Sequence, residues 1–180
     1  MSDAQEEVLR TEQVYQGRVL SLRIDHIRLP DGTTTQREIV EHGGAVAIVP
    51  LDDQDNVYLV HQYRAPLGRQ LLEIPAGNLE AGEDPVQTAQ RELQEEIGYF
   101  PGQLAALGAF YPVPGYGTEA LHLFLARNLT PSSLPADADE SIEVKKMPFH
   151  EALNLIDTGK MEDGKTIAGL LRVARYLAEQ

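Results

Sequence analysis

One segment, residues 77–99, restricts the fold of this chain more than any other part of its sequence. The segment specifies a helix through local signals: Asp84 can cap the first turn, and Pro85 suits the first helical position. Gln87 is spaced to complete a capping box with Asp84, and Gly98 can end the last turn. We therefore expect a helix that begins at Pro85 and runs to the residue before Gly98.

The expected helix has one apolar face. Its members recur at helical spacing and are Val86, Ala89, Leu93 and Ile97. A stripe of this kind packs against another element, because most helical stability in proteins comes from burying such a face. We expect the partner of this helix to be a sheet.

The N-terminal part of the chain predicts a small unit of its own. Residues 1–13 are polar and acidic, and we expect a loose tail or an extended arm. Residues 14–41 place β-forming side chains on both sides of a Pro-Asp-Gly turn at 30–32, which is typical of antiparallel strands. A glycine pair follows, so we expect two domains, residues 1–43 and residues 44–180.

The remainder alternates only partly between strands and helices. Apolar runs bounded by turn residues predict strands at residues 45–51, 57–60, 71–74, 104–111, 121–126 and 142–147. Two further helices are expected at residues 149–158 and 163–178. Because strict alternation is absent, the pattern predicts an α/β fold with a mixed sheet packed between helices.

Charge and composition narrow the classes of partner. The 180 residues carry a formal net charge of −13, whereas long duplex nucleic acids bind mainly through Lys and Arg, so we expect no nucleic-acid partner. The chain has no cysteine, which excludes disulfides and thiolate metal sites. The N-terminus lacks the features of a signal peptide and no segment approaches a membrane span. We therefore expect a cytoplasmic protein without a membrane partner.

Three glutamates of the expected helix lie close together. Glu92, Glu95 and Glu96 stand at positions i, i+3 and i+4, so their side chains point the same way and repel one another. A hard divalent cation would offset this repulsion, and Mg²⁺ is usually held by a few carboxylates together with substrate phosphates. A solvated acidic face is the alternative interpretation.

The same glutamates belong to a longer pattern, G-x5-E-x7-R-E-U-x-E-E-x-G-U, in which U is an apolar residue. Its fixed positions are filled by Gly77, Glu83, Arg91, Glu92, Leu93, Glu95, Glu96 and Gly98, with Tyr99 at the final position. The segment resembles the signature of the Nudix hydrolases at every fixed position. The resemblance implies a Nudix-type α/β/α sandwich with a mixed sheet, preceded here by the small N-terminal antiparallel β unit.

The resemblance also implies a metal site with two or three Mg²⁺ or Mn²⁺ ions. Its ligands would be Glu92 and Glu96, with Glu95 bound directly or through water, and the backbone carbonyl of Ala76. Arg91 and Glu83 would pair to hold the loop against the helix. Metals held in this way act as Lewis acids on diphosphate oxygens and lower the pKa of a bound water.

A loop beyond the helix is similar to one in the ADP-ribose pyrophosphatase subfamily. Residues 114–119, Pro-Gly-Tyr-Gly-Thr-Glu, resemble the loop S-P-G-x-x-x-E, with Val113 in place of the serine. The resemblance implies that Pro114 and Gly115 contact the substrate. It also makes Glu119 the first candidate for the general base that deprotonates the attacking water, and the helix glutamate at position 95 is the second.

Two upstream segments carry the same resemblance. The run His-Gln-Tyr-Arg at 61–64, followed by Leu-Glu-Ile-Pro-Ala-Gly at 72–77, is similar to R-Q-Y-R and L-E-x-P-A-G of that subfamily. Arg64 would clamp a phosphate or stack on the adenine, and a salt bridge at the edge of the core is its alternative role. Arg37 lies in a run similar to the strand that crosses to the partner subunit in these dimeric enzymes and helps to recognise adenine. We therefore expect a homodimer.

These features together predict a Mg²⁺-dependent hydrolase that splits the diphosphate bond of ADP-ribose into AMP and ribose 5-phosphate. Two alternatives stay open. The first is a Nudix pyrophosphatase for another nucleotide sugar such as GDP-mannose. The second is a non-catalytic nucleotide sensor, since some Nudix-like domains only bind.

A second motif fits the expression for a phosphate-binding loop but lacks the structural context of one. Residues 159–166 fit the P-loop expression G-x4-G-K-[ST], but a P-loop follows a buried strand, whereas this run follows a helical segment. We expect instead that Gly159 ends one helix and Asp163 caps the next.

Overall fold

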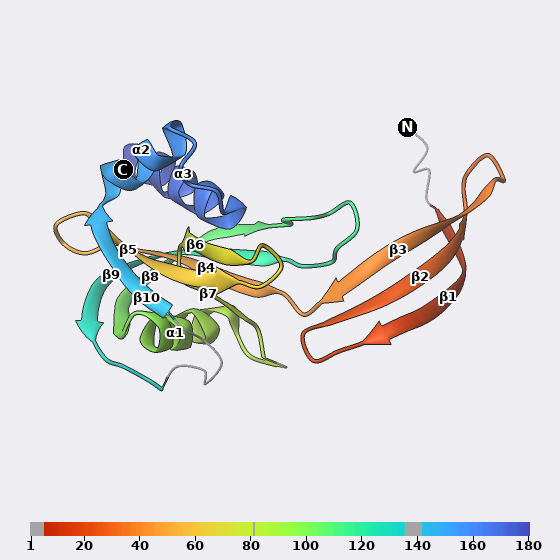
Figure 1. Ribbon diagram of the computed structural model, residues 1–180, viewed down its shortest axis with the longest axis horizontal. Helices are drawn as coiled ribbons and strands as arrows, with labels where there is room; N and C mark the ends of the chain where they lie inside the picture. Colours follow the sequence, from red (N-terminus) through yellow and green to blue (C-terminus); the bar gives the residue numbers. More distant parts are fainter. Residues whose placement is uncertain (1–5, 81, 136–141) are drawn as a thin grey trace. The chain divides into compact units, whose positions relative to one another are not determined.

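The computed structural model describes residues 6–80, 82–135 and 142–180 of the chain. It contains two compact units (Figure 1). The first comprises the residues up to Gly44 together with Tyr111–Ala120, and the second comprises Ala45–Phe110 with Leu121–Gln180. No helix among the described residues is both long and apolar enough to cross a membrane.

The first unit is an antiparallel sheet of three strands in the order β1-β2-β3. These strands are β1 (Glu7–Gln16), β2 (Leu20–Arg28) and β3 (Thr34–His42). The predicted turn is confirmed, with Gly32 at φ +87° between β2 and β3. Of the two alternatives for residues 1–13, the loose tail is wrong from Glu7 onward and the extended arm agrees with the structure, because this segment pairs along β2 from Glu7 opposite Arg28 to Gln16 opposite Ser21. Its polar composition reflects a strand that is exposed along its whole length.

The described residues of the second unit form seven strands in two sheets. They are β4 (Ala45–Pro50), β5 (Asn56–Arg64), β6 (Arg69–Glu73), β7 (Ala76–Asn78), β8 (Tyr99–Phe110), β9 (Leu121–Pro131) and β10 (Ile142–Pro148). One sheet has the order β7-β4-β9-β8 and the other has the order β10-β5-β6. Strands β4 and β9 run parallel, whereas the pairs β4–β7 and β8–β9 are antiparallel, so the predicted mixed sheet is confirmed.

In the described part of the second unit, three helices flank the strands: α1 (Pro85–Glu96), α2 (Phe149–Asp157) and α3 (Gly164–Ala178). Strand β4 is buried along its whole length, and its alternate side chains face opposite sides of the sheet. Val46 and Ile48 pack in the cluster that includes α1, and Ala47 and Val49 pack in the cluster that includes α2 and α3. Figure 1 shows α1 on one side of the strands and the other two helices on the opposite side. The predicted α/β/α sandwich is therefore confirmed.

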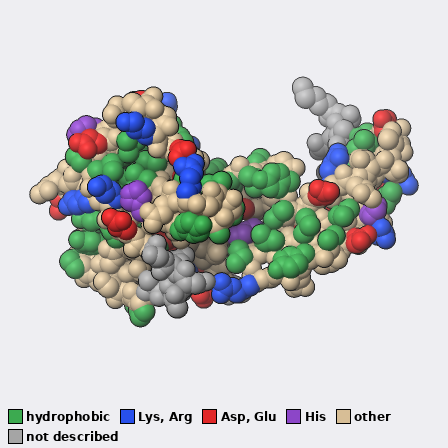
Figure 2. Space-filling view, in the orientation of Figure 1, with side chains coloured by type: hydrophobic (Ala, Val, Ile, Leu, Met, Phe, Trp, Pro, Cys, Tyr) green, Lys and Arg blue, Asp and Glu red, His purple; other side chains and the backbone are tan. Residues whose placement is uncertain are grey.

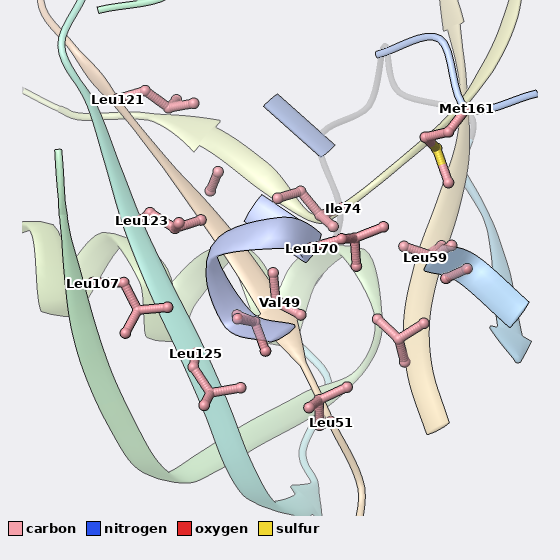
Figure 3. Close-up of a cluster of buried hydrophobic side chains, with 14 of the residues drawn as sticks. Val49, Leu51, Leu59, Ile74, Leu107, Leu121, Leu123, Leu125, Met161 and Leu170 are labelled. Carbon is pink, nitrogen blue, oxygen red and sulfur yellow. The ribbon is translucent and has the colours of Figure 1, made fainter. Parts of the chain in front are cut away.

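The larger core cluster lies under α2 and α3 (Figure 3). It joins side chains from strands that are far apart in the sequence, among them Val49, Leu59 and Leu123, to Leu170 of α3. Ile74, in the short link between β6 and β7, belongs to the same cluster and is 1% exposed. The core therefore reaches the chain segment that precedes α1, the helix that carries the predicted metal ligands.

The burial of α1 differs from the prediction in one respect. Ala89, Leu93 and Ile97 are buried as expected, but Val86 is 41% exposed and Thr88 is fully buried instead. At about 100° per residue, the buried positions form an arc that extends from the apolar stripe across Glu96 and Glu92 to Thr88. The helix therefore buries part of its acidic face, which an apolar pattern alone could not indicate.

Candidate active site

Local signals set both ends of α1. The Asp84 carboxylate accepts a hydrogen bond from the backbone N–H of Val86 at 2.8 Å, and Pro85 occupies the first turn. The Asp84 side chain therefore caps the helix as predicted, and Gln87 is exposed. At the other end Gly98 has φ +75°, a left-handed conformation that favours glycine and ends the helix.

Two of the three clustered glutamates are buried. Glu92 is 8% exposed and Glu96 is 6% exposed, although both are acidic. The Glu96 carboxylate accepts a hydrogen bond from the Ala76 backbone N–H at 3.3 Å. Burial of carboxylates is costly unless a cation or hydrogen-bond donors compensate them. The alternative of a solvated acidic face therefore does not describe these two residues.

Strand β7 lies directly against this acidic face. An added Cβ at Gly77 would lie 1.9 Å from the carboxyl carbon of Glu92, so only glycine fits there. The backbone of β7 pairs with β4, with Gly77 opposite Val46 and Ala76 opposite Ala47. Because β4 is the buried central strand, it holds the β7 backbone beside both buried carboxylates.

Arg91 contacts three acidic residues. Its guanidinium donates to both carboxylate oxygens of Glu83 at 3.2 and 3.1 Å, and its Nη1 donates to Glu92 at 2.6 Å and to Glu95 at 2.9 Å. The same guanidinium reaches the Asn78 carbonyl at 3.4 Å. Arg91 therefore ties the loop before α1 to the helix.

The charges of this cluster shift two pKa values. The pKa of Arg91 is raised well above its usual range, mainly because it hydrogen-bonds to Glu83. The same bond lowers the pKa of the Glu83 carboxyl below its ordinary value. Both groups are therefore held in their charged forms around neutral pH.

A positive charge lies within the acidic cluster. The guanidinium of Arg91 offsets part of the repulsion that the sequence led us to attribute to divalent cations. In the part of the chain that the structure describes, no three acidic or histidine side chains are arranged around a common point that could hold a metal ion. The donors present are carboxylates and the backbone of β7, and such oxygen ligands suit Mg²⁺ or Mn²⁺. The chemistry of the donor set therefore fits a hard divalent cation.

Arg64 makes the salt bridge that was its alternative role. Its Nε and Nη2 donate to the two oxygens of Glu73 at 2.7 and 2.5 Å, and Glu73 is 1% exposed. Lys165 also donates to Glu73. The pKa of Arg64 is raised, first by the hydrogen bonds with Glu73 and further by the charges of Asp163 and Glu96. Glu73 was not among the predicted site residues, although a charge beside an apolar run is a signal that it needs a partner.

The first unit carries the other predicted residues, Arg37, Pro114, Gly115 and Glu119. The loop that contains the last three joins β3 through backbone hydrogen bonds of Val40 with Tyr116 at 2.8 Å and Thr118 at 3.0 Å. The Val113 carbonyl closes the turn by accepting from two backbone N–H groups at 3.1 and 2.8 Å. That contact uses the backbone, so valine can replace the serine of the subfamily without altering the turn.

Arg37 is engaged in an ion pair on the surface of the first unit. Its Nη2 donates to Glu6 at 2.6 Å, and both side chains are more than two-fifths exposed. An exposed pair of this kind contributes little to stability. Pro114 and Gly115 are exposed and Glu119 is partly buried.

Comparisons with known proteins agree with this architecture. The NUDIX domain matches residues 41–170, and the nucleoside diphosphate sugar hydrolase N-terminal domain matches residues 6–40. A methanol dehydrogenase activator from Bacillus methanolicus is 42% identical over 91% of this chain and 89% of its own length. An ADP-ribose pyrophosphatase from Bacillus subtilis (strain 168) is 40% identical over 92% of this chain and 91% of its own length.

A solved structure shows the same fold. The crystal structure of an ADP compounds hydrolase superposes with a TM-score of 0.89 and covers 100% of this chain and 98% of its own, at 24% sequence identity. The motif of residues 77–99, the sandwich and the family matches point to one conclusion. The chain belongs to the NUDIX family and is a Nudix hydrolase.

Proposed function

We propose that this protein hydrolyses the diphosphate bond of ADP-ribose to AMP and ribose 5-phosphate in a Mg²⁺-dependent reaction. The observation that carries this proposal is the burial of Glu92 and Glu96 against a glycine backbone that leaves no room for a side chain. The name of the Bacillus subtilis relative supports ADP-ribose as the substrate.

The metal site would consist of Glu92, Glu96 and the Ala76 carbonyl, with Glu95 as a direct or water-mediated ligand. Two or three Mg²⁺ ions, or Mn²⁺ in their place, would polarise the phosphate oxygens and lower the pKa of a water molecule. Arg91 has one nitrogen on Glu92 and Glu95 and two on Glu83, so it holds the two helix carboxylates beside the loop that precedes α1. The protein thereby supplies ligands whose positions are set before the substrate binds.

Proton transfer from the water requires a general base. Glu119 is our first candidate and Glu95 is the second. The variants E119Q and E95Q separate the two candidates. The variant that lacks the general base is expected to lose the acidic limb of the pH profile of kcat, and the other variant is expected to keep it. Glu119 is rejected as the base if E119Q retains both the acidic limb and full turnover.

Substrate binding would use four further residues. Arg37 would help to recognise the adenine, Pro114 and Gly115 would contact the substrate, and Arg64 would clamp a phosphate or stack on the adenine. Arg64 keeps one nitrogen, Nη1, outside its two hydrogen bonds with Glu73, so phosphate contact does not require the salt bridge to break. We further propose that the N-terminal unit, residues 1–43, forms a homodimer.

Direct assays test the substrate. The protein is incubated with ADP-ribose, GDP-mannose, ADP-glucose and NADH in the presence of Mg²⁺, and kcat/KM is compared among them. ADP-ribose is expected to be the best substrate. A tenfold or larger preference for another nucleotide sugar would reject ADP-ribose in favour of that compound. Binding of ADP-ribose without turnover would support the non-catalytic sensor instead.

A metal titration tests the site. Glu96→Gln removes one charge from the buried pair, and we expect its Mn²⁺ affinity and kcat both to fall by about a hundredfold. Glu151→Gln, an exposed glutamate on α2, is the matched control and is expected to behave like the wild type. Full turnover by E96Q would show that this carboxylate holds no catalytic metal.

A further inference from the structure

Residues 159–166, the run that fits the P-loop expression, include side chains that hold the chain segment leading into the proposed metal site. Thr166 is fully buried at the start of α3, and its Oγ1 accepts a hydrogen bond from the backbone N–H of Ile74 at 2.8 Å. The same hydroxyl donates to the capping carboxylate of Asp163 at 2.5 Å. Because the hydroxyl proton is committed to Asp163, its lone pair is oriented to receive the Ile74 N–H.

A second contact presses α3 against the same residue. An added Cβ at Gly169 would lie 2.8 Å from Cδ1 of Ile74, so the helix approaches Ile74 with no side chain between them. Figure 3 shows Ile74 among the core side chains around Leu170, the next residue of α3. Helix α3 therefore holds Ile74 by its backbone and by its side chain.

A third contact holds the preceding residue. Glu73 is buried and receives hydrogen bonds from Arg64 and Lys165, and Lys165 also donates to Asp163 at 3.0 Å. The lysine and threonine that would bind phosphate in a P-loop instead contact Glu73 and Ile74. This is the structural role of the glycine-lysine-threonine run.

The held segment continues directly to the acidic face of α1. Pro75 follows Ile74, its ring fixes one backbone dihedral, and its carbonyl accepts from the Ile48 N–H at 2.9 Å. The next two residues are Ala76, which donates to Glu96, and Gly77, which lies against Glu92. A displacement of Ile74 would therefore reach the buried carboxylates through a short and stiff piece of backbone.

We propose that Thr166 is a positioning residue for the metal site, acting through Ile74 on the strand β7 that crosses the acidic face of α1. This inference rests on the proposed function, because it requires a metal ion at that face. Thr166 belongs to the opposite face of the sheet from α1, so its role is to place ligands and not to bind the metal.

Direct metal binding to the full-length protein tests the proposal. Thr166→Val keeps the shape of the side chain and removes the acceptor for Ile74, whereas Thr166→Ser keeps the hydroxyl. Mn²⁺ binding is measured without substrate by electron paramagnetic resonance, and the Mg²⁺ concentration for half-maximal activity is measured in parallel. We expect T166V to bind Mn²⁺ about tenfold more weakly and to need correspondingly more Mg²⁺, with T166S close to the wild type. Equal Mn²⁺ affinity of T166V and the wild type would overturn the proposal.

A matched control separates positioning from general loss of stability. Val173→Ala removes two buried methyl groups from the same helix, two turns beyond Thr166, and is expected to keep wild-type Mn²⁺ affinity. If V173A weakened Mn²⁺ binding as much as T166V, the proposal would be wrong. Thr166→Cys, with a weak sulfur acceptor, is a milder variant that is expected to bind with intermediate affinity if T166V does not fold. A wild-type protein that binds no Mn²⁺ would instead reject the proposed function itself.

Discussion

Single residues show how the chain tolerates a cluster of acids on one helix. Arg91 lies among Glu83, Glu92 and Glu95 and donates to each of them within 3.2 Å. Because the guanidinium is part of the protein, its charge stabilises the acidic face whether or not a metal is bound. A divalent ion then needs to balance only the negative charge that Arg91 does not neutralise.

The Glu83–Arg91 pair makes stability depend on pH in a defined direction. The folded pKa of Glu83 is lowered, so its contribution is present above the unfolded pKa and is lost as the pH falls through the folded pKa. We expect Glu83→Gln to be less stable than the wild type at pH 7, by about 1 kcal/mol, and the difference to be smaller at pH 3, below the ordinary pKa of a glutamate. Urea unfolding at both pH values measures it. An equal difference at both would show that the charge is not the cause.

Gly77 is the residue at which a single carbon should abolish the site. In Gly77→Ala the new methyl group would overlap the carboxylate of Glu92, which must move or push β7 away. We expect kcat/KM to fall by about a hundredfold, as displaced catalytic groups do, and stability to fall by about 1–3 kcal/mol from overpacking. Gly164→Ala is the control, because a Cβ there meets open space. Normal activity of G77A would contradict the close contact.

At the level of elements, α1 combines a conventional helix with an unconventional buried face. Its cap, proline and terminal glycine follow local rules, and so its limits were predicted almost to the residue. Its orientation was not, because the side that faces the protein includes Thr88, Glu92 and Glu96 as well as apolar residues. The buried side of α1 therefore combines apolar residues with two glutamates of the candidate site.

The cap of α1 offers a test at this scale. Asp84→Ala removes the acceptor for the Val86 N–H, and we expect a loss of about 1 kcal/mol in the free energy of unfolding. Asp84→Asn retains a capping oxygen and is expected to lose only a fraction of that amount. Urea denaturation of the three proteins gives the comparison. If D84N were as unstable as D84A, the cap would not be the source of the effect.

At the level of the whole molecule, the first unit has little core of its own. Among its described residues, Ile27 and Asp25 are buried, while large apolar side chains on β1, β2 and their connection are exposed, namely Val8, Leu9, Val14, Tyr15, Val19 and Leu20. Figure 2 shows hydrophobic side chains gathered over this sheet. A three-stranded sheet with such exposure is typical of a surface that binds another chain.

The proposed homodimer is tested by charge substitution on this sheet. Leu20→Asp places a carboxylate among the exposed apolar residues, and we expect the dissociation constant of the dimer to rise by about tenfold or more. Leu171→Asp, on the exposed side of α3, is the control and should leave the assembly unchanged. Analytical ultracentrifugation over a concentration series measures both. A dimer that L20D leaves intact would exclude this sheet as the interface.

The sequence alone determined the features that depend on neighbouring residues. The spacing of the acidic motif, the limits of α1 and the cap at Asp163 are local, and each appears in the structure as the sequence indicates. The mixed sheet and its flanking helices also followed from strand and helix patterns. Strand limits were less accurate, since β8 begins at Tyr99 and β9 continues to Pro131, because pairing extends strands beyond their apolar residues.

Only the tertiary structure decided which distant residues meet. Thr166 contacts Ile74 across 92 positions of sequence, and Lys165 reaches Glu73 over the same separation. The loop of residues 111–120 joins β3 through backbone hydrogen bonds between residues that are also far apart in the sequence. Such contacts leave no periodic signal, because they depend on how the sheet brings separate segments together and on which buried charges then find partners.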